Sequence, residues 1–153
     1  MRPIIRPAQP EDALAVSSLA AEFAAYLRAL GDTVDTCLDG AIYLRDGFGA
    51  NPAFSGLVAE ANGRIVGYLL YHPSYNVDDL TRTLHIIDLY VQEDCRRQGI
   101  GKSLMAEAAA VCRRLGGTQL FWSVYTPNET ALAFYQRIGA RYTRDLVFMR
   151  LDC

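Results

Sequence analysis

Cysteine is scarce in this sequence, and its few copies are scattered. The 153 residues include four cysteines, none of them in a Cys-x-x-Cys pair: Cys37, Cys95, Cys112 and Cys153. This spacing fits neither a zinc site nor a disulfide framework. We therefore expect no metal centre, and we expect the protein to occupy a reducing compartment.

Long apolar runs and an excess of basic residues are missing as well. Without a signal peptide or a long apolar run, the sequence predicts a cytoplasmic protein that does not enter a membrane. Lysine and arginine (15) are outnumbered by aspartate and glutamate (17), which gives a net charge of −2. Nucleic-acid binding leaves a basic footprint, so nucleic acid is not an expected partner. A Gly-x-Ser-x-Gly nucleophile elbow is also absent, so the sequence gives no sign of a serine nucleophile of that type.

The rest of the composition is that of one globular domain covering residues 1–153. Hydrophobic residues make up 51% and charged residues 21% of the chain, which is ordinary for a soluble domain. Hydrophobic periodicity predicts helices over residues 10–30, 36–46, 100–115 and 128–138. It predicts strands over residues 4–5, 57–61, 64–71, 84–91 and 119–125, with one or two more within 141–151. Asn62-Gly63 is the preferred two-residue hairpin turn, and the order of elements predicts an α+β fold.

A glycine-rich segment between a strand and a helix is the most informative part of the chain. It reads Arg-Arg-Gln-Gly-Ile-Gly-Lys over residues 96–102. The first N–H groups of a helix have no partner inside it, and the helix dipole adds partial positive charge there. We expect Gly99 and Gly101 to take positive φ and to let a ligand approach the backbone. Full charges come from Arg96, Arg97 and Lys102, and the combination predicts a diphosphate site.

Two familiar phosphate-binding motifs do not fit this segment. A P-loop needs Gly-x-x-x-x-Gly-Lys-Ser/Thr, but Gly99 and Gly101 stand only two positions apart. The dinucleotide fingerprint Gly-x-Gly-x-x-Gly needs a third glycine where this chain has Leu104. What remains is Arg-x-x-Gly-x-Gly after a strand that ends Asp88-Leu89-Tyr90-Val91.

A second motif follows about 30 residues later in the chain. Residues 128–140 read Asn-Glu-Thr-Ala-Leu-Ala-Phe-Tyr-Gln-Arg-Ile-Gly-Ala. Asn128 suits a helix start, and Gly139 suits the left-handed cap at its end. Between them, Ala131, Phe134 and Tyr135 belong to one apolar stripe, which predicts an amphipathic helix.

Together the two motifs resemble those of the GNAT superfamily of acyl-CoA-dependent N-acetyltransferases, and the likeness runs from Ile4 to Leu151. The resemblance implies a mixed, mostly antiparallel sheet with a V-shaped splay, flanked by about four helices. It also implies acetyl-CoA as co-substrate. The residues that it assigns to cofactor binding are Leu89, Tyr90, Val91, Arg96, Arg97, Gln98, Gly99, Ile100, Gly101, Lys102 and Asn128.

A narrower likeness lies in the segment Asp46-Gly47-Phe48-Gly49. It resembles part of the diamine (spermidine/spermine) and thialysine acetyltransferase branch, although a helix end followed by a Gly/Pro turn explains it equally well. The branch implies that the acceptor is a primary amine of a small molecule, such as a diamine, a polyamine or a lysine analogue. Relatives in this branch form homodimers, so a homodimer is expected by resemblance.

The resemblance assigns Tyr135 the role of general acid at the cofactor sulfur. A tyrosine pKa of about 10 lies above that of a thiol, so proton donation to a leaving thiolate is favourable. A backbone N–H near Leu89 is expected to polarise the thioester carbonyl. The glutamate that serves as base in the diamine branch is replaced by Ile87, which leaves Asp88, His85 or a water relay, and Asp88 is our candidate. Strand alternation predicts that Asp88 and His85 lie on opposite faces of the sheet.

Three other functions stay open at this point. The acceptor could instead be a protein N-terminus or a lysine side chain. Because the expected glutamate is missing, the chain could also be a non-catalytic acyl-CoA-binding domain. Nucleotide binding by a P-loop-like site is disfavoured by the glycine spacing and by a pI near 5.6.

Overall fold

The computed structural model describes residues 3–153 and divides the chain into two compact units. The first unit ends at Ser123 and contains the sheet, and the second covers Val124–Cys153. Over the described residues the chain forms four α-helices and five strands. This content confirms the predicted α+β class.

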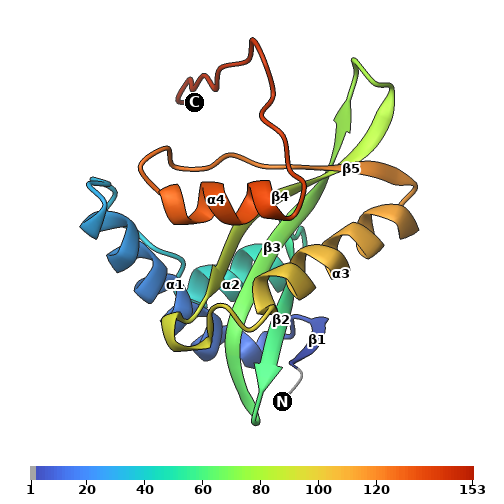
Figure 1. Cartoon of the computed structure of the whole chain (residues 1–153). Helices are drawn as coiled ribbons and strands as arrows, with labels where there is room; N and C mark the ends of the chain where they lie inside the picture. Colours follow the sequence, from blue (N-terminus) through green and yellow to red (C-terminus); the bar gives the residue numbers. More distant parts are fainter. Residues whose placement is uncertain (1–2) are drawn as a thin grey trace. The chain divides into compact units, whose positions relative to one another are not determined.

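One five-stranded sheet organises the first unit (Figure 1). Its strands follow one another in chain order: β1 (Ile4–Pro7), β2 (Ser55–Ala61), β3 (Arg64–Asn76), β4 (Thr81–Val91) and β5 (Gly117–Phe121). Neighbouring strands are antiparallel, except that β5 runs parallel to β4. β4 pairs with β5 only from Arg82 to His85, although β4 continues to Val91. The sheet is therefore mixed and mostly antiparallel, and its last two strands part beyond His85, where the splay is expected.

The hairpin between β2 and β3 forms as the sequence predicts. Asn62 and Gly63 have φ values of 53° and 72°, which is the left-handed pair that a type I′ turn requires. The next hairpin is longer than expected, because β3 extends to Asn76 and β4 already begins at Thr81. Residues 72–76 and 81–83, which lie outside the predicted strands, are therefore paired strand as well.

Helices cover both faces of this sheet. α1 (Ala13–Ala29) and α2 (Gly40–Phe48) pack on one face, in a buried cluster that includes Val16, Tyr43, Tyr68 and Tyr90. α3 (Ile100–Arg114) packs on the opposite face, where Leu104 lies 3.5 Å from the position that a Cβ of Gly67 would take. Two short 3-10 helices, Pro10–Asp12 and Glu93–Cys95, precede α1 and α3. No helix in the described part of the chain is both long and apolar enough to cross a membrane.

The second unit contains α4 (Glu129–Arg137) and the C-terminal segment. The strands expected within 141–151 are wrong for this structure, since residues 141–153 form no regular element. Large apolar side chains are mostly exposed there, among them Val147 at 83% and Met149 at 91%. Asp145 has a φ of 59°, which interrupts extended backbone, and a strand without a neighbour to pair with has little stability of its own.

Candidate active site

The turn from β4 into α3 has the backbone geometry of an anion site. Gly99 caps the helix in the left-handed region, with φ of 81°, and the first helical bond runs from Ser103 N–H to Gly99 O at 2.9 Å. The N–H groups of Ile100, Gly101 and Lys102 therefore precede the helical ladder and have no acceptor within it. The expectation of positive φ at Gly101 is wrong because this residue lies inside the helix. Arg97, with φ of 60°, is the second left-handed residue of the turn.

The basic side chains of this turn fall into two groups. Arg97 and Lys102 are exposed, as a phosphate contact requires. Arg96 is half-buried instead, and its Nε donates to the backbone oxygen of Val91 at 2.9 Å. The guanidinium carbon lies 4.9 Å from the ring centroid of Tyr26 and 5.2 Å from that of Tyr90. The sequence assigns all three cations to a diphosphate site. In the structure Arg97 and Lys102 are exposed, whereas Arg96 is half-buried against the protein.

One edge of β4 is free where it approaches this turn. Gln92 N–H donates to Val66 O at 2.9 Å, toward β3. Because N–H and C=O point in opposite directions across a trans peptide, Val91 C=O points away from β3. Leu89 has the same orientation as Val91, two residues earlier. Over the described residues β5 pairs no further than His85, so both backbone groups of Leu89 lie on an edge without a strand partner.

A bulge in β4 changes which side chains share a face. Leu70 pairs with Asp88 and Tyr71 with Ile86, so Ile87 is an extra residue that β3 does not match. His72 pairs with His85 across the same two strands. Residues that pair across two neighbouring strands point to the same side of the sheet. Leu70 and His72 are two positions apart on β3, so their side chains share one side. Asp88 and His85 therefore lie on the same face, and the expectation of opposite faces is wrong.

The carboxyl group of Asp88 lies in a buried, hydrogen-bonded environment. The Tyr68 hydroxyl donates to Asp88 Oδ2 at 2.5 Å. Burial raises the pKa of Asp88 to about 6, and hydrogen bonds from the Tyr68 hydroxyl and the Leu89 backbone N–H oppose the rise. Burial, followed by the charge of Asp88, holds the pKa of Tyr68 well above its usual value. Asp88 therefore titrates close to neutrality, where a proton acceptor is most useful.

Two imidazoles follow Asp88 along this face. The rings of His72 and His85 stack with centroids 5.0 Å apart. The rings of His85 and Phe121 pack edge to face, with centroids 5.7 Å apart. Burial lowers the pKa of His85, and the neighbouring His72 lowers it further. At neutral pH His85 is thus a neutral ring, which is the form that can accept a proton.

The second unit holds the other two candidate residues. Asn128 caps α4, because its Oδ1 accepts from Ala131 N–H at 3.2 Å. Tyr135 lies on the same helix, with its ring 5.1 Å from that of Phe134. The predicted helix start is therefore confirmed, while the pantetheine contact of Asn128 and the acid role of Tyr135 stay predictions.

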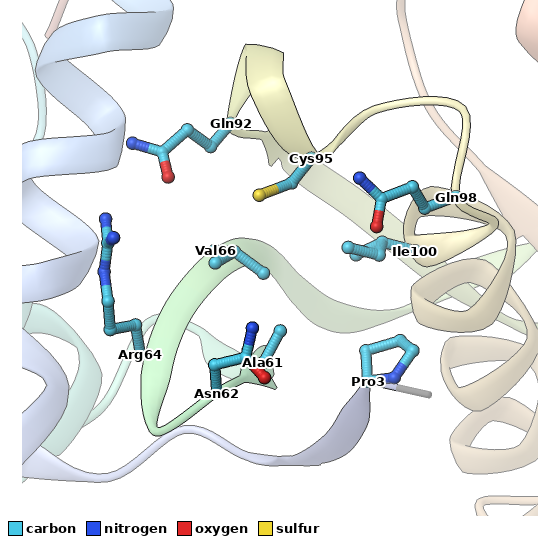
Figure 2. A pocket seen from close by; sticks show the side chains of 9 residues that line it. All are labelled: Pro3, Ala61, Asn62, Arg64, Val66, Gln92, Cys95, Gln98 and Ile100. Atoms are coloured by element: carbon cyan, nitrogen blue, oxygen red, sulfur yellow. The ribbon is translucent and has the colours of Figure 1, made fainter. Parts of the chain in front are cut away.

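A cavity of about 220 Å³ lies beside the turn between β4 and α3 (Figure 2). Figure 2 shows Cys95, at the end of the 3-10 helix, and Gln98, on the turn, across the cavity from Val66 and Asn62 of the β2–β3 hairpin. Gln98 also donates to Asp94 O at 3.3 Å, which ties the turn to the 3-10 helix before it. The residues that line the cavity are Pro3, Ala61, Asn62, Arg64, Val66, Gln92, Cys95, Gln98 and Ile100.

The Asp-Gly-Phe-Gly segment forms the end of α2. Phe48 is the last helical residue, and its ring lies 5.1 Å from that of Tyr43. Ala53 N–H donates to Asp46 O at 2.7 Å, which closes the following turn. A Cβ on Gly47 would come within 2.7 Å of the Phe54 ring. These contacts give the segment a structural role and explain its glycine at position 47.

Sequence reasoning missed Tyr68 and Tyr26. Tyr68 lies near the centre of an apolar strand, and only the pairing of β3 with β4 brings its hydroxyl to Asp88. Tyr26 lies 70 positions before Arg96, so no local spacing connects the two. The Asn62-Gly63 turn is the one signal that constrains the β2–β3 register, and it does not extend to β4. As for metals, the described residues contain no group of three or more His, Cys, Asp or Glu placed to hold an ion.

Comparison with known proteins agrees with this geometry. Thialysine N-epsilon-acetyltransferase of Sus scrofa is 38% identical over 104 residues, which cover 63% of this chain and 61% of that protein. L-ornithine N5-acetyltransferase NATA1 of Arabidopsis thaliana is 30% identical over 57% of this chain and 38% of its own length. An integron cassette protein from the mobile metagenome of V. cholerae has a solved structure that matches with a TM-score of 0.82 at 25% identity, covering 100% of this chain and 94% of that one.

The fold is that of an α+β protein with a glycine-rich turn between β4 and α3. The model of the acetyltransferase (GNAT) family matches residues 20–140. The chain therefore belongs to the GNAT acetyltransferase family. It spans about three fifths of the length of the thialysine acetyltransferases that it matches, 61% for the pig protein.

Proposed function

We propose that the protein is an acetyl-CoA-dependent N-acetyltransferase that transfers acetyl directly to a primary amine of a small molecule. The observation that carries this proposal is the meeting of three features near the end of β4. These are the glycine-rich turn, the unpaired edge at Leu89 and the buried carboxyl group of Asp88. Membership of the GNAT family supports the same activity.

The turn supplies groups that fit the diphosphate of coenzyme A. Free N–H groups of Ile100, Gly101 and Lys102 point from the start of α3, where the helix dipole also favours an anion. The exposed side chains of Arg97 and Lys102 add two full charges. Leu89 offers its outward backbone C=O to an extended arm, in the way that a peptide adds a strand to a sheet edge. Asn128 is the proposed further contact to that arm.

Two proton transfers and one oxyanion contact make up the proposed chemistry. When bound, acetyl-CoA supplies an acetyl group activated as a thioester. Asp88 takes a proton from the amine as the C–N bond forms, and Tyr135 gives a proton to sulfur as the C–S bond breaks. Leu89 N–H stabilises the negative charge that develops on the carbonyl oxygen. In the structure this N–H donates to the Asp88 carboxyl group. In the proposed step it turns to the carbonyl oxygen as Asp88 takes up the proton of the amine.

The pKa of Asp88 suits the role of base. At about 6 it leaves the carboxyl group mostly ionised at pH 7. It is also closer to the pKa of an alkyl amine, about 10, than an ordinary carboxyl group would be. His85 lies on the same face as Asp88 and is the alternative proton acceptor. A water relay between the amine and either group fits the same arrangement.

The acceptor is proposed to be a small amine of the lysine, ornithine or diamine type. The names of the thialysine and ornithine acetyltransferases support this class. The surroundings of Asp88 support it too, since an ionised carboxylate and nearby aromatic rings attract a cationic amine. The stacked imidazoles of His72 and His85 add further aromatic surface on that face.

A turnover assay with a panel of amines tests this proposal. The protein is incubated with acetyl-CoA and thialysine, ornithine, lysine, spermidine or a lysine-containing peptide, and free thiol is measured as it forms. We expect at least one small amine to be acetylated faster than the peptide, and Tyr135→Phe to slow that reaction. Faster reaction of the peptide would assign a protein acceptor instead. Coenzyme A binding without any turnover would leave a non-catalytic domain and contradict the proposal.

A further inference from the structure

The side chain of Arg96 is held at three points, all within the first unit. Its Nε donates to Val91 O, the acceptor at the end of the free edge of β4. Its guanidinium carbon lies 4.9 Å from the Tyr26 ring centroid on α1 and 5.2 Å from the Tyr90 ring centroid on β4. A planar guanidinium can stack on aromatic rings and donate from its edge at the same time. Arg96 thus connects three elements: the turn between β4 and α3 (residues 92–99, here called the cofactor turn), the end of β4, and helix α1.

The two rings that hold Arg96 are themselves fixed. The Tyr90 hydroxyl donates to Glu22 Oε2 at 3.4 Å, and Gln92 Nε2 donates to Glu22 Oε1 at 3.2 Å. Phe23 stacks on both rings, with its centroid 5.1 Å from that of Tyr90 and 6.5 Å from that of Tyr26. These contacts come from α1 on one side and from the end of β4 on the other. The position of the Arg96 guanidinium is therefore set before any ligand arrives.

We propose that Arg96 is a positioning residue that locks the cofactor turn to β4 and α1, and that it is not a ligand of the phosphates. This inference rests on the proposed function, because it concerns how the same turn binds coenzyme A. It gives the first arginine of Arg-x-x-Gly-x-Gly a different role from its neighbour. Arg97 and Lys102 keep the phosphate role, since their side chains are exposed.

The hydrogen bond from Arg96 to Val91 affects how a ligand can pair with the free edge of β4. Arg96 Nε already donates to the outward carbonyl of Val91 and so competes with an extended ligand for that acceptor. The next outward pair of backbone groups belongs to Leu89, two residues earlier. Arg96 therefore sets the point at which strand-like pairing of the cofactor arm begins. It also links the cofactor turn to α1, which packs on the face of the sheet that carries Asp88.

Matched lysine substitutions at the two arginines separate the roles. Arg96→Lys keeps the charge but loses the planar fork, and Arg97→Lys makes the same change at the exposed neighbour. Affinity for coenzyme A is measured by calorimetry on the full chain, with circular dichroism to confirm folding. We expect Arg96→Lys to weaken binding about tenfold, since two stacking contacts and one charged hydrogen bond are lost. Arg97→Lys keeps the charge at the proposed phosphate contact and should weaken binding less than Arg96→Lys does.

The stacking partner provides an independent test. Tyr26→Leu removes one ring and should weaken coenzyme A binding several-fold, whereas Tyr26→Phe keeps the ring and should restore most of the affinity. Variants that remove each charge test how the affinity for coenzyme A depends on ionic strength, because salt screens contacts between exposed charges. Arg97→Gln should flatten the dependence of affinity on ionic strength more than Arg96→Gln does.

Three results would overturn the inference while leaving the proposed function in place. They are normal affinity in Arg96→Lys, normal affinity in Tyr26→Leu, and a flatter salt dependence in Arg96→Gln than in Arg97→Gln. Failure of the unmodified protein to bind coenzyme A would overturn the proposed function and this inference together.

Discussion

At the scale of single residues, Asp88 carries a conflict between stability and chemistry. Its carboxyl group accepts a hydrogen bond from the Tyr68 hydroxyl, and burial raises its pKa to about 6 from an ordinary value of 3.8. An acid whose pKa is higher in the folded state stabilises the fold below the unfolded pKa and loses that contribution as pH rises through the folded pKa. The ionised form that the chemistry needs at pH 7 is thus the less stable one.

Replacing Asp88 by asparagine should therefore separate activity from stability. We expect kcat/KM to fall by about 10²- to 10⁴-fold, the usual contribution of a general base. We expect the free energy of unfolding at pH 7 to rise by about 1–2 kcal/mol, less than the full cost of the raised pKa because the new amide N–H group needs a partner. Urea unfolding at pH 7 and pH 4 measures this gain, which should vanish at the lower pH. A variant that is active and less stable at pH 7 would contradict the assignment.

Tyr68 should tune the pH at which Asp88 works. Its hydroxyl donates to the ionised carboxylate and so lowers the pKa of Asp88 against the effect of burial. In Tyr68→Phe the pKa of Asp88 should rise further, and the acid limb of the profile of kcat/KM against pH should move to higher pH. Tyr71→Phe is the matched control, because Tyr71 alternates to the opposite face of β3 and pairs with Ile86. Equal profiles for Tyr68→Phe and the unmodified protein would exclude Asp88 as the group that titrates.

At the scale of elements, the turn between β4 and α3 depends on one left-handed glycine. Gly99 has φ of 81°, and no atom lies within 4 Å of the position that a Cβ would take. A substitution there is strained by the backbone alone. The cost for an alanine in this region is about 1–2 kcal/mol.

Gly99→Ala should therefore weaken coenzyme A binding by about tenfold while lowering the melting temperature only modestly. The hairpin turn offers a matched control in Gly63→Ala, since Gly63 has φ of 72° and equally open surroundings. The control should lose similar stability and keep its affinity for coenzyme A. Calorimetry and thermal unfolding on both variants measure the two effects. Equal affinities in the two variants would remove the turn from the binding site.

Local patterns predict most of the elements but not their pairing. The Asn62-Gly63 turn, the amphipathic helices and the glycine at the start of α3 are local signals, and the structure confirms them. The bulge at Ile87 is not local, because it exists only relative to β3. It reverses the side on which His85 lies relative to Asp88. The contact of Arg96 with Tyr26 is equally non-local, so the motif alone does not show where this side chain lies.

At the scale of the whole molecule, ion pairs connect the first strand to the rest of the first unit. Arg6 Nη1 and Nη2 each lie 2.8 Å from an oxygen of Asp12, and Nε lies 3.3 Å from Glu60. The Asp12 side chain is 7% exposed. Hydrogen bonding to Arg6 lowers the pKa of Asp12 below its ordinary value of 3.8, against the effect of burial. Arg6 of β1 thus joins the segment before α1, through Asp12, to β2, through Glu60.

Asp12→Asn should destabilise the protein in a pH-dependent way. An acid with a lowered folded pKa stabilises the fold above its unfolded pKa and loses that contribution as pH falls through the folded value. We expect a loss of about 1–3 kcal/mol at pH 7, as for other charged hydrogen bonds, shrinking below pH 4. Asp46→Asn breaks an exposed pair with Arg45 and should change stability very little. A loss for Asp12→Asn that does not depend on pH would show that packing, not charge, is responsible.

The sequence could not predict the division of the chain into two compact units. Composition and length suit a single domain of residues 1–153, and that interpretation stays a prediction beside units that meet at Ser123 and Val124. The C-terminal segment reads as strand because Leu146, Val147 and Phe148 favour extended structure. A strand needs a neighbour, however, and sequence alone does not say whether one is present. The expected homodimer is likewise a prediction from resemblance.

The central claim is that the turn between β4 and α3 holds the diphosphate of coenzyme A. Titration calorimetry with coenzyme A and with pantetheine, which has the same arm but no diphosphate, tests it most directly. We predict clear binding of coenzyme A that weakens with added salt, and little or no binding of pantetheine. Equal binding of the two ligands, or no binding of coenzyme A, would contradict the claim.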